Sequence, residues 1–289
     1  MLALDQSLFS YLPVRVVTAV PLAYEFTDST NALWLIGTDE PRVLFLKLLA
    51  RDTTPFWQVM DALFDVRPRD QYGHYADLYE RIALMTPLSI PNLRYCSSQT
   101  ADHAAYVLTD MLFGEPIHAE QVTENMVIRL AQHLVALHRN AQSTWGSFLN
   151  GQGAASDWAF AVRETLSYVF PNDDSIRGFN HQPSCFVPMM PDLRWDQFLM
   201  VDGRLSALVD LDAFVFAPLE LDFVLLEYLL SAEQLTVWRE AYLNAGGFIP
   251  SITDVREVYR KLLFAMNVLG EDDLSCWLAH PCHFDQLVK

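Results

Sequence analysis

The stretch of sequence that decides the fold is Met190–Asp222, MPDLRWDQFLMVDGRLSALVDLDAFVFAPLELD. Two apolar runs in it flank the turn signal Asp202–Gly203, a pattern that predicts a β-hairpin. Because a hairpin returns the chain to its starting end, Asp192, ahead of the first strand, is expected to lie near Asp210, after the second. Gln197 directly precedes the first strand. The sequence therefore predicts that two carboxylates and one amide group converge at one end of the hairpin.

These residue types have two interpretations. Carboxylate and amide oxygens are the hard ligands that Mg²⁺ prefers, and Mg²⁺ in turn binds phosphate oxygens. Asp is also common in turns and at helix N-termini, where its side chain only accepts hydrogen bonds from the backbone. Taken alone, Asp192 and Asp210 fit the second interpretation better. The rest of the chain has to decide between them.

The pattern of apolar residues changes once along the chain, near residue 112. Before that point, apolar and β-branched runs alternate with helical spacing, whereas afterwards helical spacing prevails outside the hairpin. The sequence predicts an α+β fold, with a five-stranded antiparallel sheet and a helix in residues 1–112 and a mostly helical part in residues 113–289. Apolar runs locate predicted strands at residues 14–20, 32–36, 43–49 and 106–111.

The balance of charge excludes some partners. The chain carries 19 Lys and Arg against 36 Asp and Glu, a formal net charge of −17. Nucleic-acid binders and polybasic membrane-surface proteins depend on Lys and Arg, so the sequence predicts neither kind of partner. After residue 112 there are 11 basic and 23 acidic side chains, an excess that suits a cationic or polar small molecule. The sequence leaves the oligomeric state open.

Composition is typical of a folded globular protein, with 52% apolar and 19% charged residues. The first residues, MLALDQSLFSYLP, have no basic segment ahead of an apolar one, so no signal peptide is predicted. No apolar run approaches the roughly 18 residues of a membrane span. Four Cys residues are too few for a disulfide scaffold in a chain of 289 residues. These features predict a cytoplasmic protein.

The same stretch resembles the catalytic core of the aminoglycoside phosphotransferase and choline kinase family, whose members share a protein-kinase-like fold. The family pattern is His-Gly-Asp, an Asn five residues after that Asp, two apolar strands around a turn with Gly, and a triplet similar to Ile-Asp-Trp. Asp192 matches the first Asp, and Val209–Leu211 matches the triplet at the family's usual separation of 18 residues. Asp222 matches the Asp at the next helix start, and LAQHLVALH, ending at His138, resembles another family helix. The resemblance implies a bilobal fold, with a small antiparallel-sheet N-lobe and a larger helical C-lobe that contains the substrate cleft.

The resemblance extends to residues 1–112 and implies a nucleotide site there. Lys47 takes the position of the lysine that binds the nucleotide phosphates, and Glu80 takes that of its ion-pair partner. Asn31 resembles the Asn of the family's nucleotide loop. The segment YVLTDMLFG resembles the hinge between lobes, where the Thr109 carbonyl and the Met111 amide would bind adenine.

By this resemblance the chain is a phosphotransferase that moves the γ-phosphate of ATP or GTP to a hydroxyl of a small molecule. Asp192 would accept or orient the hydroxyl proton. Asp210 and Gln197 would hold Mg²⁺, and Lys47 with Glu80 would bind the phosphates. The expected partners are a nucleotide and a small-molecule acceptor. The sequence neither chooses between ATP and GTP nor names the acceptor.

Two departures from the family pattern support an alternative function. Met190 replaces the His two residues before the catalytic Asp, and Met cannot donate the hydrogen bonds by which that His supports the loop. Gln197 replaces the metal-binding Asn and carries the amide oxygen on a longer, more flexible arm. Mg²⁺ requires near-ideal octahedral geometry, so a longer arm places the ligand less well. The alternative is a catalytically impaired pseudokinase that acts as a ligand-binding or scaffold protein.

A second group of candidate ligands lies near the C-terminus: Cys276, His280, Cys282 and His283. All four belong to the residue types that bind zinc. Their spacing matches no common zinc motif, and Cys and His are also ordinary residues at buried positions and helix ends. The sequence leaves open whether these four residues bind a metal.

Overall fold

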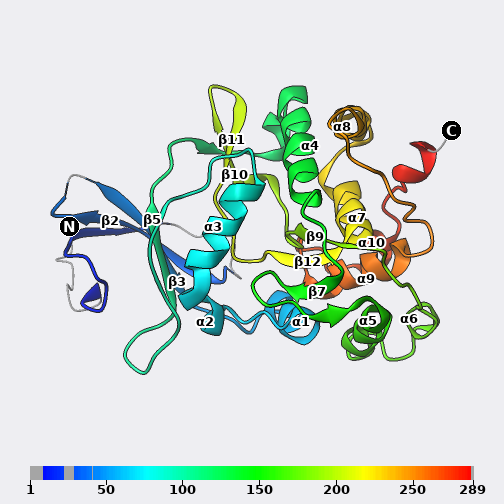
Figure 1. The fold of residues 1–289 in the computed structure, drawn as a ribbon, viewed down its shortest axis with the longest axis horizontal. Helices are drawn as coiled ribbons and strands as arrows, with labels where there is room; N and C mark the ends of the chain where they lie inside the picture. Colours follow the sequence, from blue (N-terminus) through cyan, green and yellow to red (C-terminus); the bar gives the residue numbers. More distant parts are fainter. Residues whose placement is uncertain (1–8, 23–28, 41, 288–289) are drawn as a thin grey trace. The chain divides into compact units, whose positions relative to one another are not determined.

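The computed structural model describes residues 9–22, 29–40 and 42–287 (Figure 1). The chain forms two compact units that interleave along the sequence. The first unit takes the chain up to residue 54, with residues 67–82 and 90–113; the second takes residues 55–66 and 83–89 and the chain from residue 114 onward. The predicted division between residues 112 and 113 into a nucleotide-binding lobe and a substrate lobe stays a prediction.

A five-stranded antiparallel sheet forms the first unit, as the sequence predicts (Figure 1). The apolar runs locate four of its strands. They do not locate the fifth, Leu93–Ser97, because Arg94 and Ser97 interrupt its apolar pattern. The first unit also contains the helix α2 (Pro68–Gln71) and most of the helix α3 (Tyr75–Met85). In spatial order the strands are β1 (Val16–Pro21), β2 (Asn31–Thr38), β3 (Val43–Leu49), β5 (Tyr106–Asp110) and β4 (Leu93–Ser97).

Strand geometry places Lys47 on one particular face of this sheet. Successive side chains of a strand point to opposite faces. Leu44 and Leu46 of β3 lie in the apolar core cluster of the unit, together with Ile36 of β2 and Leu108 of β5. Lys47 therefore lies on the opposite face, and its side chain is only 7% exposed.

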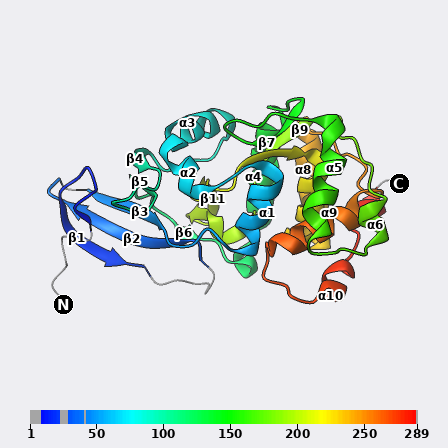
Figure 2. The same ribbon diagram turned by 90° about the horizontal axis from the view of Figure 1, so that it is seen from below.

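Helices make up most of the second unit. The contacts that join them pair α4 with α8, and α9 with each of α1, α5, α7 and α10. Figure 2 shows α5 and α9 side by side. The helices are α1 (Pro55–Phe64), α4 (Glu124–His138), α5 (Trp158–Ser167), α6 (Asp174–Arg177), α7 (Leu219–Leu229), α8 (Ala232–Asn244), α9 (Arg256–Met266) and α10 (Leu274–Leu278).

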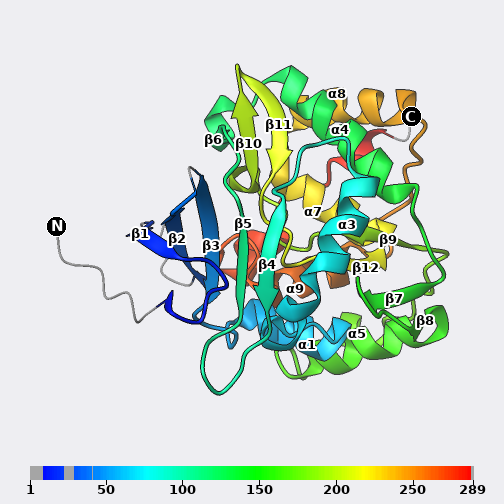
Figure 3. The same cartoon turned by 60° about the vertical axis from the view of Figure 1, so that its left-hand side comes forward.

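Two small sheets interrupt the helices of the second unit. The first contains the predicted hairpin, β10 (Phe198–Val201) and β11 (Arg204–Leu208), and β6 (Glu115–Pro116). The short 3-10 helix η5 (Trp195–Gln197) leads into β10. Figures 1 and 3 show this hairpin beside α4, which β11 contacts. The prediction of a hairpin at this place is confirmed.

The second small sheet contains strands that the pattern of apolar residues did not locate. It contains four strands in the order β8-β7-β12-β9. β9 and β12 are buried along their whole length, so they show no alternation of apolar and polar residues, and each contains a proline. Both properties hide a strand from periodicity. The strands are β7 (Thr144–Ser147), β8 (Gly153–Ala154), β9 (Phe186–Met189) and β12 (Val215–Pro218).

Membrane-spanning helices were sought throughout the part of the chain that the structure describes. No helix there has both the length and the apolar character that crossing a bilayer requires.

Candidate active site

The loop that carries Asp192 is held in place by every second residue. It follows β9 and runs through η5 into β10. Leu193, Trp195 and Gln197 are buried. Asp192 and Arg194, each of which directly precedes one of these buried residues, are partly exposed. The alternation anchors one side of the loop in the second unit and leaves the Asp192 side with access to its surroundings.

Gln197 fixes the orientation of the Asp192 carboxylate. Its side-chain nitrogen Nε2 donates a hydrogen bond to Asp192 Oδ2 at 3.1 Å. Its oxygen Oε1 accepts a hydrogen bond from the Arg194 backbone N–H, also at 3.1 Å. Since the side chain is 3% exposed and both ends of its amide are occupied, Gln197 joins the two ends of its own loop. The sequence did not predict this role, although the spacing from Arg194 to Gln197 is that of a helix capping box.

The β10–β11 hairpin brings Asp210 to the same place. Phe198 pairs with Leu208 at the open end of the hairpin, and the Val209 N–H donates to the Gln197 carbonyl at 2.9 Å. Asp210 therefore directly follows Val209, whose backbone is hydrogen-bonded to Gln197, and the Gln197 side chain in turn binds Asp192. The predicted convergence of these residues at one end of the hairpin is what the backbone pairing produces.

Burial and the charges of neighbouring groups act together on the Asp192 carboxyl group. Burial raises the pKa of Asp192 well above its usual range, and the negative charge of Asp210 raises it further. Asp212 acts in the same direction, whereas the positive charge of Arg194 acts against it. Arg194 in turn donates to both carboxylate oxygens of Asp196, at 3.0 and 3.4 Å. This end of the hairpin is thus an acidic site moderated by one arginine.

A divalent cation fits this acidic pair. Neighbouring carboxylates disfavour each other's ionised form, and a bound cation removes that penalty. Asp192 Oδ1 is buried and accepts no hydrogen bond from the described residues, so the pair keeps an oxygen available as an acceptor. The donor set, carboxylate and amide oxygens, is the set that Mg²⁺ prefers. Ligation by Asp210 and Gln197 stays a prediction.

The family's supporting His has no equivalent at Met190, which is an apolar anchor with 3% of its surface exposed.

A histidine at the end of α4 joins three helices of the second unit. His138 Nε2 lies 2.8 Å from Asp222 Oδ2, and His138 Nδ1 lies 2.7 Å from the Tyr242 hydroxyl. These bonds join α4 to the first turn of α7 and to α8. Asp222 therefore serves to hold the helices together.

The residues predicted to bind the nucleotide phosphates belong to the first unit. Lys47 lies in β3 between its cross-strand neighbours Leu33 and Val107. Asn31 is the first residue of β2, and its Oδ1 accepts a hydrogen bond from the Tyr72 hydroxyl at 2.8 Å. Glu80 lies on α3 with an exposed side chain. The ion pair between Lys47 and Glu80 stays a prediction.

The residues predicted to bind adenine lie at the end of β5. Thr109 is 4% exposed and pairs with Phe45 of β3 and Leu93 of β4. Met111 follows the last residue of the strand and is 45% exposed. The chain therefore leaves the sheet at the predicted hinge, whose binding of adenine stays a prediction.

The Cys and His residues near the C-terminus do not gather into a group of metal ligands in the part of the chain that the structure describes. No three or more His, Cys, Asp or Glu side chains come together as metal ligands anywhere in residues 9–22, 29–40 and 42–287. His280 Nε2 lies 2.6 Å from the backbone oxygen of Glu227, and its ring stacks on Tyr228. This histidine has a structural role at the surface of α7.

Comparison with known proteins identifies the fold but not a close relative. No protein-family model matches the sequence, and no curated protein matches it. Many solved structures match, and several of them cover nearly the whole chain. The macrolide 2'-phosphotransferase MphH from Brachybacterium faecium is 14% identical, with a TM-score of 0.61, over 96% of this chain and 98% of that one.

Two further structures among these matches contain ligands. Spectinomycin phosphotransferase, APH(9)-Ia, in complex with ADP and spectinomycin is 12% identical, with a TM-score of 0.52, over 96% of this chain and 91% of that one. The GDP and kanamycin complex of APH(2")-IIia is 14% identical, with a TM-score of 0.55, over 98% and 95%. The chain thus has the protein-kinase-like fold of antibiotic phosphotransferases, and the predicted fold is confirmed.

Proposed function

We propose that this chain transfers the γ-phosphate of ATP or GTP to a hydroxyl group of a small molecule. The observation that carries the proposal is the convergence of Asp192 and Asp210 at the open end of the β10–β11 hairpin. Proteins of the same fold have been crystallised with ADP and spectinomycin and with GDP and kanamycin. Both pairs consist of a nucleoside diphosphate and a small molecule.

Asp192 is the residue that acts on the acceptor. Its carboxylate is held by Gln197 Nε2 at 3.1 Å, so its orientation is set before an acceptor binds. Its raised pKa brings the carboxylate closer to the basicity that a general base needs near neutral pH. The acceptor hydroxyl donates to this carboxylate, which takes the proton as the phosphate is transferred.

Asp210 is the residue that holds the metal, with the Gln197 amide oxygen as a second ligand. Mg²⁺ supplies neutralisation of the charge on the phosphate oxygens. Lys47, supported by Glu80, binds the phosphates of the nucleotide. Asn31, Thr109 and Met111 complete the nucleotide site in residues 1–112. Catalysis of this type depends mainly on positioning and charge neutralisation.

The acceptor is a cationic or polar molecule bound by residues 113–289. These residues carry 23 acidic and 11 basic side chains. An excess of negative charge raises the local concentration of a cation and accelerates its association. This charge supports an amine-bearing acceptor over an anionic one.

The second candidate function is a pseudokinase that binds nucleotide or acceptor without transfer. Gln197 favours it, because its amide oxygen already accepts a hydrogen bond from the Arg194 N–H. Met190 favours it too, because a buried thioether replaces a hydrogen-bond donor.

One experiment separates the two functions. The purified chain is incubated with ATP or GTP and Mg²⁺ and with kanamycin, spectinomycin or a macrolide, and the products are examined by mass spectrometry. The proposal expects one added phosphoryl group on an acceptor, and none with Asp192→Asn. Melting temperatures with and without nucleotide are recorded alongside. A rise with nucleotide but no product with any acceptor supports the pseudokinase, and no rise with either nucleotide contradicts the phosphotransferase.

A further inference from the structure

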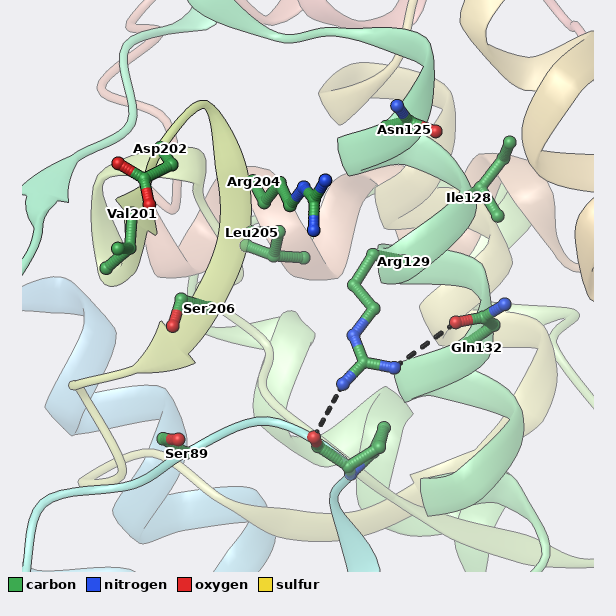
Figure 4. Close-up of a pocket in the computed structure, with 11 residues that line it drawn as sticks. Ser89, Asn125, Ile128, Arg129, Gln132, Val201, Asp202, Arg204, Leu205 and Ser206 are labelled. Carbon is green, nitrogen blue, oxygen red and sulfur yellow. Dashed lines mark hydrogen bonds between the residues drawn. The ribbon is translucent and has the colours of Figure 1, made fainter.

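An open cavity of ≈ 900 Å³ lies at the surface of the second unit, apart from the residues proposed for catalysis, and most of its lining residues are exposed. Its walls come from the tip of the β10–β11 hairpin, the first half of α4 and residues 87–89 (Figure 4). Asp192, Gln197 and Asp210 do not line it. The volume is in the range of cavities that take small organic ligands.

Two arginine side chains give this cavity a positive centre. Arg129 of α4 and Arg204 of β11 both line it, and both guanidinium groups point into the space between hairpin and helix (Figure 4). The acidic residue in the lining is Asp202, whose carboxylate lies away from both guanidinium groups (Figure 4). A paired positive centre is unusual for a chain whose net charge is −17.

The two arginines differ in how they are held. Arg129 donates one hydrogen bond to the Pro87 carbonyl at 2.8 Å and one to Gln132 Oε1 at 3.3 Å. These bonds fix its guanidinium and leave further N–H donors for a ligand, since the group has five. The Arg204 side chain is exposed, and it has no hydrogen bond or ion pair from its guanidinium to the part of the chain that the structure describes, so these donors are available to a ligand.

The remaining lining combines neutral polar and apolar groups. Ser89 and Ser206 provide hydroxyl groups beside the positive centre, and Ile128 and Leu205 provide apolar surface from the two facing elements. A ligand with one charged end and one apolar end matches this division. Two like charges that face each other across a cavity repel. An anion that binds between them is attracted to both, and this attraction offsets the repulsion.

We propose that this cavity binds a small organic anion, whose phosphate or carboxylate group lies between Arg129 and Arg204 and whose apolar body contacts Ile128 and Leu205. Guanidinium groups bind both oxyanions through paired N–H···O bonds. The proposal is independent of the proposed phosphotransfer, because the cavity shares no residue with the predicted catalytic set.

Calorimetric titration of the full chain tests the proposal with three probes of similar size: phenylphosphonate, benzoate and uncharged benzamide. Phenylphosphonate or benzoate is expected to bind, and whichever binds more tightly identifies the preferred oxyanion. Benzamide is expected not to bind measurably. The substitution Arg204→Gln is expected to weaken anion binding about tenfold, because it removes one charged donor pair. Raising the salt concentration is expected to weaken binding as well.

The matched control is Arg177→Gln, which changes an exposed arginine on α6 outside the cavity. It is expected to leave anion binding unchanged. The proposal is wrong if neither anion binds, if benzamide binds as tightly as the anions, or if Arg204→Gln and Arg177→Gln have equal effects. It is also wrong if Lys47→Gln removes binding while Arg204→Gln does not, since the probe then occupies the predicted nucleotide site.

Discussion

Gln197 has an unusual position among the residues of the candidate site. Its amide group spans from the Arg194 N–H to the Asp192 carboxylate, with 3.1 Å at each end. The Gln197 side chain is longer than the Asn of the family pattern, and in the folded chain this longer side chain reaches both the Arg194 N–H and the Asp192 carboxylate. A residue that looks like an imperfect metal ligand in the sequence is, in the folded chain, the residue that orients the predicted base.

Replacing Gln197 with Asn is expected to lower kcat about tenfold. Asn is shorter by one C–C bond, about 1.5 Å, so neither hydrogen bond of the amide keeps its length. The Asp192 carboxylate then loses its orientation, and because the amide oxygen of Gln197 is also the proposed second ligand of Mg²⁺, the KM for nucleotide is expected to rise as well. Steady-state kinetics with each substrate varied in turn measures both quantities.

The matched control for this substitution is Gln234→Asn on α8. Gln234 Oε1 accepts from the Ser231 N–H at 3.0 Å, in the same type of capping box. Its loss weakens a helix cap by about 1 kcal/mol without touching the site. Equal kcat values for Gln197→Asn and the unsubstituted chain would show that Gln197 does not position the base.

At the scale of elements, one buried carboxylate joins α7 to α9. Glu227 is fully buried, and its Oε2 accepts from Arg256 Nε at 3.0 Å and from Arg260 at 2.8 Å. Its Oε1 accepts from the Phe284 N–H at 3.2 Å. The segment after α10 is therefore attached to the same group that pairs the two helices.

Glu227→Gln is expected to destabilise the chain by about 3 kcal/mol, because buried Arg260 loses the charge that compensates it, while Arg256 keeps its ion pair with Asp285. Urea unfolding monitored by circular dichroism measures this change. Glu240→Gln, an exposed change on α8, serves as the control and is expected to stay within about 0.5 kcal/mol. A similar small effect of Glu227→Gln would mean that the arginines find other partners.

His133 on α4 makes stability depend on pH. Burial lowers the pKa of His133 to about 3, and its Nδ1 lies 2.7 Å from the Thr86 hydroxyl. The unfolded chain binds a proton at this residue below about pH 6.5, whereas the folded chain does not until about pH 3. The free energy of unfolding is therefore expected to fall as pH decreases from 6.5 towards 3.

Thermal unfolding at a series of pH values checks this expectation. The substitution His133→Leu removes the titrating group, so its unfolding temperature should vary less with pH over this interval. Parallel curves for the two proteins would show that other groups cause the acid sensitivity.

Sequence patterns predicted some elements well and missed others for physical reasons. β3 and α4 have clear periodicity and a recognisable start or end, so their positions were predicted closely. β9 and β12 are buried on both faces, and a short apolar run of that kind is consistent with several structures. At the site, the spacing predicted that Asp192 and Asp210 meet. The role of Gln197 depends on which atoms its amide reaches, and spacing alone does not determine that.

At the scale of the whole molecule, the net charge of −17 predicts a dependence on salt. Screening shortens the range of electrostatic attraction to about 8 Å at physiological ionic strength and about 3 Å at 1 M. The KM for a cationic acceptor is therefore expected to rise several-fold between 0.05 and 0.5 M salt. Steady-state kinetics with a charged and an uncharged acceptor measures the difference, and equal responses of the two would contradict the proposed role of the acidic residues.

The turn of the β10–β11 hairpin offers a place where the chain can be lengthened. Asp202 and Gly203 both have positive φ values, and a Cβ on Gly203 would have no neighbour within 4 Å. The carboxylate pair is fixed at the other end of the hairpin, by the bond from Val209 to Gln197. An epitope or fluorophore tag inserted at the turn would disturb the arginine cavity and leave the chemistry intact. An insertion at this turn is therefore expected to remove the proposed anion site while the proposed catalytic site is retained.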